Sequence, residues 1–434
     1  MWKNSLLRLK QHGVETVPAK WTQSRVKYLG TYVNGYPFKP QDWGTVGRPI
    51  LRIQDLSSAS REPNRYDGEI PSRYLVDCGD ILISWSASLG VYRWDGERAW
   101  LNQHIFRVVL DKKQIRDDFF VWLAEWFINE MDREVHGSTM QHLTADAFGG
   151  FPVLVPPLDQ QARIAKYLDH ETARTDALVA ANERVLALLA DKRQALITFA
   201  VTRGIDPNVS LRVSTIPGVE QIPAHWETVR LRYLTTAIEQ GWSPKAANYP
   251  PNLDEWGVLK LNAVSRSRFD ETATKTLPAD VEPRADLEIC RGDVLVTRSN
   301  TPGLVGDACF VEAMRPRLML SDIIYRLTVN RQLVAGKFLV YFLTIPAGRI
   351  QIENDARGTS ASMVKISQDH IKNWRIPVPP LNEQHAATDY LDGETAQIDE
   401  LVTETRATIA LLKERRSSLI AAAVTGQIDM EHTV

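Results

Sequence analysis

The sequence has few cysteines and no long apolar run. Three of its 434 residues are cysteine, Cys78, Cys290 and Cys309, and no two of them form a CxxC pair. An odd number of widely spaced thiols is typical of a protein in a reducing compartment and argues against a disulfide-stapled scaffold. The chain also lacks the apolar core of a signal peptide and any run long enough to cross a membrane. These absences predict a cytoplasmic protein.

The motifs of common enzyme classes are missing as well. The sequence contains no GxxxxGKS/T phosphate-binding loop, no HExxH or paired CxxC metal pattern, no GxSxG nucleophile elbow and no GxGxxG fingerprint. Residues 248–251 hold the letters of the Asn-Pro-Pro-Tyr motif of amino-methyltransferases in the wrong order, and we interpret them as a surface turn. His136 and His142 share a predicted loop, where isolated imidazoles are more often hydrogen-bonding groups than metal ligands. We therefore predict no catalytic residue and no metal site.

A strong charge of one sign is absent too. The formal net charge is -2, which by itself does not predict a nucleic-acid-binding protein. Acidic residues outnumber basic ones in residues 380–429, whereas the two balance in residues 157–206, so the rest of the chain has a mild basic excess. That excess is compatible with DNA binding without being diagnostic of it.

What the sequence does contain is a long internal repeat. Residues 156–206 align without a gap with residues 379–429, and 24 of the 51 aligned positions are identical. Unrelated segments of this length would share about three. Both copies begin with PPLxxQ, continue with a Tyr-Leu-Asp-x-Glu-Thr motif and end with Val-Thr-x-x-Ile-Asp. The repeat predicts a chain of two related halves.

Each copy of the repeat is predicted to form a long helix that starts after its proline pair. Apolar residues recur at intervals of three, four and seven, which draws one stripe down a helix face. The stripe residues are Leu178, Val185, Leu189, Leu196 and Phe199 in the first copy, and Leu401, Leu412 and Leu419 in the second. We expect the stripes to pack on each other, because neither helix would be stable alone in water. The first helix, from about residue 171 to 203, would be roughly 50 Å long, and Gly393 is predicted to mark a break before the second.

The segments before each copy also correspond to each other. Residues 17–21 align with residues 222–226, and we assign Trp21 and Trp226 within them to packing. Short alternating apolar runs predict strands, and one apolar run in each half predicts a buried helix. The predicted strands are 50–53, 79–83 and 105–109 in the first half and 258–261, 292–296 and 324–328 in the second, and the predicted helices are 119–123 and 338–342. Each half is therefore predicted to have an α+β head followed by a helix.

The repeated motifs resemble those of the specificity subunit of type I restriction-modification systems. The resemblance covers nearly the whole chain, and the doubling of the motifs makes it specific. It implies two pseudo-symmetric mixed α/β target-recognition domains joined by two long antiparallel coiled-coil helices. The implied segments are a first target-recognition domain at 1–155, a central helical region at 156–206, a second target-recognition domain at 207–378 and a C-terminal helical region at 379–434.

The resemblance also implies a function. It suggests a DNA-reading subunit without catalysis of its own, which binds an asymmetric bipartite target in double-stranded DNA. The expected partners are two methyltransferase subunits, which carry S-adenosylmethionine, and restriction subunits, which use ATP and magnesium. No cofactor is expected on this chain, and no membrane partner. A rigid helix pair between the two heads would place the half-sites about one DNA turn apart.

Candidate base contacts lie in loops that differ between the halves. Residues 85–88 (Trp-Ser-Ala-Ser) stand where the second half has residues 298–301 (Arg-Ser-Asn-Thr). Arg298 can grip guanine in bidentate fashion and Asn300 can grip adenine. A polar turn that closes a hairpin is an equally weighted interpretation, and basic residues contact phosphate more often than base edges. The candidates are Trp85, Ser86, Ser88, Gln103, His104, Thr139, Gln141 and His142 in the first half, and Asn262, Arg266, Arg268, Arg298, Ser299, Asn300, Ser360, Ser362 and Lys365 in the second.

Several alternatives stay open on the sequence alone. Asn182 and Lys192 interrupt the apolar stripe, and they either fix the helix register or point outward. Asp389, Glu400 and Glu404 form either a docking face for a partner or an ordinary solvated face. For the whole chain, a protein-interaction scaffold with two heads on a helical spacer is the alternative to a DNA-reading subunit. An enzyme with an unfamiliar site is the third possibility.

Overall fold

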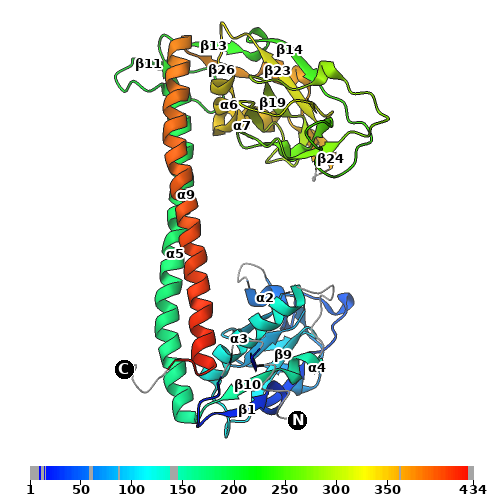
Figure 1. Cartoon of the computed structure of the whole chain (residues 1–434), viewed down its shortest axis with the longest axis vertical. Coiled ribbons are helices and arrows are strands. Elements are labelled where there is room, and N and C mark those ends of the chain that lie inside the picture. Colours follow the sequence, from blue (N-terminus) through cyan, green and yellow to red (C-terminus); the bar gives the residue numbers. More distant parts are fainter. Residues whose placement is uncertain are drawn as a thin grey trace. The chain divides into compact units, whose positions relative to one another are not determined.

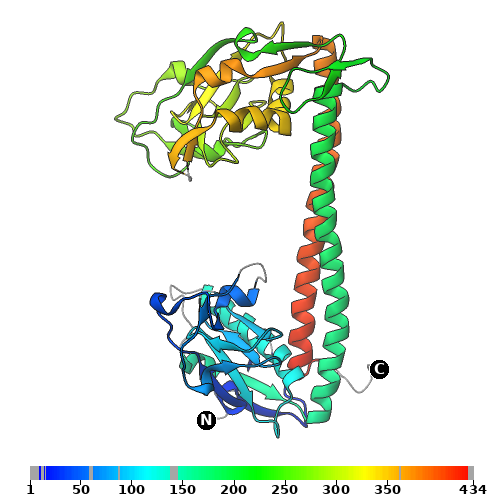
Figure 2. The same ribbon diagram turned by 180° about the vertical axis from the view of Figure 1, so that it is seen from behind.

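The chain folds as two compact units. The computed structural model describes residues 9–10, 14, 16–57, 62–86, 88–136, 145–360 and 363–428. Unit 1 comprises residues 1–183 and 406–434, and unit 2 comprises residues 184–405. Each unit combines a mixed α/β part, called head 1 or head 2 below, with stretches of two long helices, α5 (Leu158–Arg203) and α9 (Leu381–Val424), which Figures 1 and 2 show from two sides. No helix in the described ranges is both long and apolar enough to cross a membrane.

Head 1 is built on an antiparallel sheet in the order β2-β9-β6-β7. Aromatic residues of α3, such as Phe119 and Phe120, share one buried core with Ile81, Ile83 and Val108 of this sheet. A second sheet has the order β4-β3-β8-β5, and β1 pairs with β10. The helices are α2 (Ile53–Ser57), α3 (Asp117–His136), α4 (Ala145–Gly150) and the short 3-10 helices η1 (Val26–Tyr28), η2 (Pro40–Asp42) and η3 (Ser72–Tyr74). The strands are β1 (Thr22–Arg25), β2 (Gly30–Asn34), β3 (Arg48–Leu51), β4 (Arg65–Tyr66), β5 (Leu75–Val76), β6 (Ile81–Ser84), β7 (Gly90–Arg93), β8 (Ala99–Leu101), β9 (Ile105–Leu110) and β10 (Pro152–Val155).

Head 2 repeats this plan. Its main antiparallel sheet has the order β14-β23-β19-β21, which matches β2-β9-β6-β7 strand for strand, and β13 pairs with β26 as β1 does with β10. Its helices are α6 (Gly336–Thr344), α7 (Pro346–Asp355), α8 (Gln368–Asn373), η4 (Leu231–Tyr233), η5 (Leu261–Ala263) and η6 (Ala285–Leu287). Its strands shared with head 1 are β13 (Glu227–Arg230), β14 (Thr235–Gln240), β15 (Gly257–Leu259), β18 (Thr274–Thr276), β19 (Val294–Thr297), β21 (Ala308–Phe310), β22 (Leu318–Met319), β23 (Ile324–Val329) and β26 (Arg375–Val378).

Head 2 also contains three small sheets. Strands β11 (Leu211–Val213) and β12 (Gln221–Pro223) pair with each other. Strands β16 (Val264–Ser265) and β17 (Arg268–Phe269) form a hairpin after β15, where head 1 has the helix α2 after β3. A further sheet has the order β20-β25-β24, with β20 (Ser299–Asn300), β24 (Arg357–Ser360) and β25 (Met363–Lys365). The β16–β17 hairpin is therefore a surface feature of head 2 on a shared scaffold, as expected for insertions in loops.

The two long helices run antiparallel, as predicted. In unit 1, Asp176 and Glu183 of α5 pair with Arg416 and Lys413 of α9, so the partner number falls as the α5 number rises. The α+β fold with two related heads and long antiparallel helices is thereby confirmed.

The predicted break at Gly393 is wrong. Helix α9 has 44 residues and continues through this glycine without interruption. The neighbouring Asp392 bonds to head 2, with its carboxylate 2.5 Å from Lys337 Nζ and 2.8 Å from the Tyr341 hydroxyl. A glycine inside a helix costs about 1 kcal/mol relative to alanine. Packing of α9 on head 2 and α5 offsets that cost.

The predicted apolar stripe is displaced from the face that packs. Leu178, Val185, Phe199 and Leu401 are exposed, so their assignment to helix packing is wrong. Leu189, Leu196, Leu412 and Leu419 are half-buried. The face that is turned inward carries Val179, Arg193, Ile197 and Ala200 on α5 and Leu391, Ile398, Ile409, Arg416 and Ile420 on α9. The periodicity of apolar residues predicted the wrong helix face, because two of the inward positions are arginines and a pattern of apolar residues does not include them.

Candidate nucleic-acid interface

The glutamine of the first PPLxxQ motif fixes α5 to head 1. The side chain of Gln161 is fully buried, and its oxygen accepts a hydrogen bond from the Arg116 backbone N–H at 2.8 Å. Its amide nitrogen donates to the backbone carbonyls of Gln114 and Pro156, each at 2.8 Å. One side chain thus joins the loop before α3 to the first turn of α5.

The glutamine of the second motif does the same in head 2. Gln384 is also fully buried, and its oxygen accepts from the Ala335 backbone N–H at 2.8 Å. Its amide nitrogen donates to the carbonyls of Leu333, at 2.9 Å, and Pro379, at 2.8 Å. The motif therefore fixes the position of each head on its own helix by the same hydrogen bonds.

Two tryptophans reinforce these junctions. The Trp21 indole N–H donates to Gln160 at 2.8 Å, and the Trp226 indole N–H donates to Glu383 at 2.9 Å. Trp226 is 2% exposed, in keeping with its predicted packing role. The sequence did not reveal the hydrogen bonds to the helix starts, because a tryptophan in isolation indicates burial and not a partner.

The repeat places an equivalent ion pair between α5 and α9 in each unit. In unit 1, Arg416 of α9 lies 2.9 Å from Asp176 of α5, and in unit 2, Arg193 of α5 lies 2.5 Å from Asp399 of α9. Arg193 and Arg416 are equivalent in the repeat, as are the two aspartates. Burial acts to raise the pKa of Asp399, but hydrogen bonds and charges from Arg193 and Arg268 outweigh it and hold that pKa below its usual value.

The two units attach this ion pair to their heads differently. In unit 1, Arg416 also pairs with Glu125 of α3, and its guanidinium lies over the Trp122 ring at 5.6 Å. In unit 2, Asp399 is bonded by Arg268 of the β16–β17 hairpin at 2.6 Å. The first connection uses a helix of the head, and the second uses a surface hairpin.

In head 1, three of the predicted contact residues lie together. Trp85, which follows β6, stacks on Phe106 at 5.9 Å between ring centroids and lies 5.5 Å from the His104 ring. Its indole N–H donates to Asn34 at 3.2 Å, a residue that the sequence did not single out. The Gln103 side-chain oxygen and His104 Nδ1 are buried and have no hydrogen-bond partner among the residues that the structure describes. Polar atoms in that state usually mark a place that water or a ligand completes.

In head 2, the β20-β25-β24 sheet gathers several candidates. Asn300 lies beside Val364 and Ser299 beside Lys365 in the register of β20 and β25. Arg298, at the start of this segment, is half-buried, and its guanidinium donates to the Asp322 carbonyl at 3.4 Å. Ser299 is 3% exposed, which removes it from the set of residues able to meet a base edge.

The remaining candidates are placed as follows. Ser86 is half-buried and Ser88 is exposed, both in the loop between β6 and β7. Asn262, Arg266 and Arg268 are exposed on η5 and the adjacent hairpin. Thr139, Gln141, His142 and Ser362 lie outside the described residues, as does the side chain of Ser360. Across the described part of the chain, no group of three or more His, Cys, Asp or Glu side chains is arranged to hold a metal ion.

Comparison with known proteins places these features in a family. Residues 18–186 match the family described as the type I restriction modification DNA specificity domain. The EcoEI specificity subunit of Escherichia coli is 35% identical over 161 residues, a match that covers 37% of this chain and only 27% of that subunit. The EcoBI specificity subunit of Escherichia coli is 19% identical over 98% of this chain and 89% of its own length. The MjaVIII specificity subunit of Methanocaldococcus jannaschii is 22% identical over 98% of this chain and 96% of its own length.

A solved structure shares the fold over nearly the full length. It is described as the structural basis underlying complex assembly and conformational transition of the type I R-M system. The TM-score is 0.68 with 16% sequence identity, and the alignment covers 95% of this chain and 100% of that chain. At this identity the likeness establishes the architecture of the two heads and helices and nothing further.

Proposed function

This chain belongs to the family of type I restriction-modification specificity subunits, and we propose that it selects the DNA sequence on which its partner subunits act. The target is an asymmetric bipartite sequence in double-stranded DNA, with one half-site for each head. The chain itself is non-catalytic in this proposal. Methylation and cleavage belong to partner subunits.

The observation that carries the proposal is one scaffold that presents two different loops. The backbone N–H of Trp85 donates to the His104 carbonyl in head 1, and that of Arg298 donates to the Ile323 carbonyl in head 2. Both residues directly follow equivalent strands, β6 and β19. An indole offers an apolar face and one donor, whereas a guanidinium offers a fork of donors suited to guanine. Equivalent positions with different chemistry support half-sites of different sequence.

Exposed leucines on the long helices support two docking faces for methyltransferase subunits. In unit 1, Leu178 is 46% exposed and Leu411 is 65% exposed. In unit 2, their repeat equivalents Leu401 and Leu188 are 47% and 66% exposed. Apolar side chains left open to water in equivalent pairs are typical of surfaces that partners cover. We propose that each pair binds one copy of the same methyltransferase subunit, as repeated surfaces bind identical partners.

The cofactors of the reaction are assigned to those partners. We propose that the methyltransferase subunits carry S-adenosylmethionine and that restriction subunits, joining the same complex, use ATP and magnesium. The acidic side chains Asp389, Glu400 and Glu404 are exposed on α9.

Co-expression with a candidate adenine methyltransferase subunit tests the proposal. Single-molecule sequencing of the host DNA should reveal methylated adenines in one asymmetric bipartite motif. Methylation by this chain alone would contradict its non-catalytic role. Unmodified DNA despite a purified complex would instead favour a protein-interaction scaffold with two heads.

A further inference from the structure

The β16–β17 hairpin of head 2 has an uncommon turn. Arg266 and Ser267 occupy its two central positions with φ of 45° and 69°, a region that glycine adopts most readily. Two-residue hairpin turns need this backbone shape and favour Asn-Gly. A residue held in such a sparsely populated region costs of order 1–3 kcal/mol. The presence of Arg-Ser in place of Asn-Gly therefore points to a use for the side chains.

Backbone contacts hold one side of the hairpin on head 2. The Arg266 N–H donates to the Asp307 carboxylate at 3.2 Å, and the Ser267 N–H donates to the Ala308 carbonyl at 3.1 Å. Phe269 packs against the buried core that contains Val264. Each strand of the hairpin has only two residues, too few to be rigid without further support.

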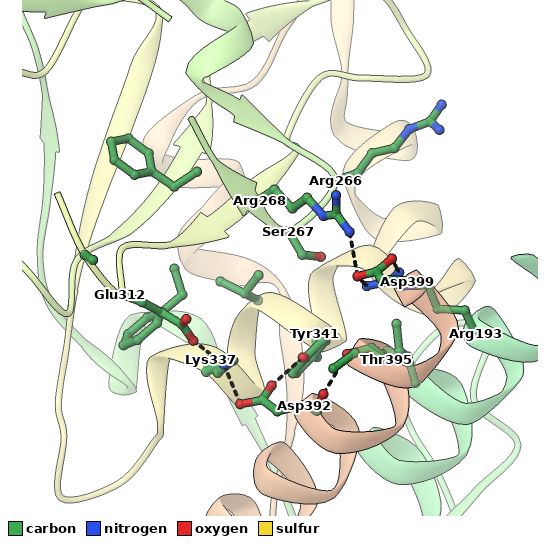
Figure 3. A pocket seen from close by; sticks show the side chains of 16 residues that line it. Arg193, Arg266, Ser267, Arg268, Glu312, Lys337, Tyr341, Asp392, Thr395 and Asp399 are labelled. Carbon is green, nitrogen blue, oxygen red and sulfur yellow. Dashed lines mark hydrogen bonds and ion pairs between the residues drawn. The ribbon is translucent and has the colours of Figure 1, made fainter. Parts of the chain in front are cut away.

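The other side of the hairpin faces α9 over a cavity of about 500 Å³. Arg268 spans this cavity, and its Nη2 donates to Asp399 Oδ2 at 2.6 Å. Arg193 of α5 donates to Asp399 Oδ1 at 2.5 Å, so the aspartate is held from both sides. Figure 3 shows Arg268 directed towards Asp399 and Arg266 directed away from it.

Three more charged residues that line the cavity, Glu312, Lys337 and Asp392, form a network of their own. Lys337 of α6 is bonded by Glu312 and by Asp392, and Tyr341 donates to the same Asp392 at 2.8 Å. Figure 3 shows this second network around Asp392 of α9, separate from the contact between Arg268 and Asp399. The contact between Arg268 and Asp399 is thus the direct charged link from the hairpin to the helix.

We propose that Asp399 is a positioning residue for DNA recognition by head 2. By holding Arg268, it fixes the hairpin on α9 and presents the exposed Arg266 to one half-site in a single orientation. The inference rests on the proposed DNA-reading function and identifies a residue on the helix that governs base preference. A contact that discriminates bases needs such support, because a side chain on a loose hairpin meets several bases equally well.

An exposed arginine also suits a DNA phosphate, and that competing role makes different predictions. If Arg268 contacts phosphate, its loss weakens binding to every sequence alike. Loss of Asp399 would then free Arg268 for the DNA and leave binding unchanged or stronger. If Asp399 positions the hairpin, loss of Asp399 and loss of Arg268 lower base preference to the same extent, and both act on one half-site only.

Unit 1 supplies a matched control. Asp176 is the repeat equivalent of Asp399 and accepts from Arg416 at 2.9 Å. Head 1 has helix α2 at the place of the hairpin, so Asp176→Asn removes an equivalent pair between the helices without releasing the β16–β17 hairpin.

The test uses the complex of the full chain with its methyltransferase subunit and a random-DNA selection. We expect Asp399→Asn and Arg268→Gln each to lower base preference about two- to fivefold in one and the same half-site, as suits a partly exposed ion pair. The double variant should lose no more than either single one, because both changes break the same contact. Asp176→Asn should leave that half-site unchanged. Uniformly weaker binding in Arg268→Gln, with Asp399→Asn unaffected, would overturn the proposal and assign Arg268 to phosphate.

Hydrogen exchange of the free chain separates this proposal from the function it rests on. Asp399→Asn should speed exchange of the Arg266 and Ser267 amides about two- to fivefold, whereas Asp176→Asn should not. Unchanged exchange in Asp399→Asn would refute the positioning role alone. A wild-type complex without any sequence preference would refute the DNA-reading function.

Discussion

Gln161 and Gln384 make the same three hydrogen bonds in two heads whose loops differ. Each accepts from one backbone N–H before a core helix of its head and donates to two carbonyls, one of them in its own proline pair. The repeated PPLxxQ motif is therefore an architectural joint. It keeps the setting of each head constant while the loops around the sheet vary.

Replacing this joint should destabilise one unit. Gln384→Leu leaves the Ala335 N–H without an acceptor and two carbonyls, one of them of the buried Pro379, without a donor, and one unsatisfied buried group costs about 1–3 kcal/mol. We expect a loss of at least that size in the unfolding free energy, measured by denaturant titration. Gln194→Leu on the exposed side of α5 is the control and should change stability by less than about 0.5 kcal/mol. Equal unfolding free energies of the two variants would show that Gln384 does not stabilise the junction between head 2 and α9.

The loop after β19 should read one half-site. Arg298→Ala is expected to relax base preference there by about 1–3 kcal/mol if the guanidinium makes a bidentate base contact, and to spare the other half-site. Trp85→Ala, at the equivalent place in head 1, should affect only the opposite half-site. Binding of variant complexes to targets mutated in each half measures both effects. A uniform loss over all sequences would reassign Arg298 to phosphate.

The exposed leucine pairs should each dock one partner subunit. Leu188→Glu combined with Leu401→Glu places charge on the face in unit 2 and should leave a complex with one methyltransferase subunit in place of two. The same changes at Leu178 and Leu411 should remove the other copy. Native mass spectrometry of the purified complexes counts the subunits. Retention of two copies by both variants would place docking elsewhere.

Stability should respond to pH through Asp307. Burial raises the pKa of this carboxyl above its usual value, although the Arg266 amide and the charges of Arg349 and Arg266 act in the opposite direction. Because the folded pKa exceeds the unfolded one, stability falls as pH rises from about 4 through the folded value. Asp307→Asn keeps an acceptor without the charge and should raise Tm by about 1–3 °C at neutral pH, with the advantage vanishing near pH 4.

Thermal scans between pH 4 and 8 measure this difference. The exposed Asp280 supplies the control, because Asp280→Asn should show no such trend. An advantage of Asp307→Asn that persists unchanged at pH 4 would point to packing and not to charge.

The gap between the half-sites is expected to follow helix length. One added heptad in α5 near Ala187 and one in α9 near Thr405 keep the 3.5-residue register of the pair and lengthen each helix by about 10 Å. That length corresponds to about three base pairs of DNA at 3.4 Å each. Methylome sequencing should show a longer gap between unchanged half-sites. A change in the half-site bases would refute the prediction that the helices set the gap and the heads select the bases.

Much of the architecture could be predicted from the repeat. A match of 24 in 51 positions predicts two long helices of one kind, and the corresponding segments before each copy predict two heads with a shared strand order. The equivalence of the Trp85 and Arg298 loops followed from the correspondence of the segments before each copy, because aligned strands end at aligned places. Asn34, which holds Trp85, was missed because a single asparagine at the end of a strand gives no sign of its partner.

The sequence by itself thus determined the two related halves and the helical character of the repeat, since these depend on local periodicity and on self-similarity. Tertiary structure alone decided which helix face turns inward and what the inward arginines contact. Arg193 and Asp399 are 206 residues apart, and Arg268 and Asp399 are 131 apart. An arginine is stable at an inward position only when a carboxylate lies opposite it. The residue that lies opposite is set by the antiparallel register of two distant helices and by the placement of a hairpin, which no local pattern records.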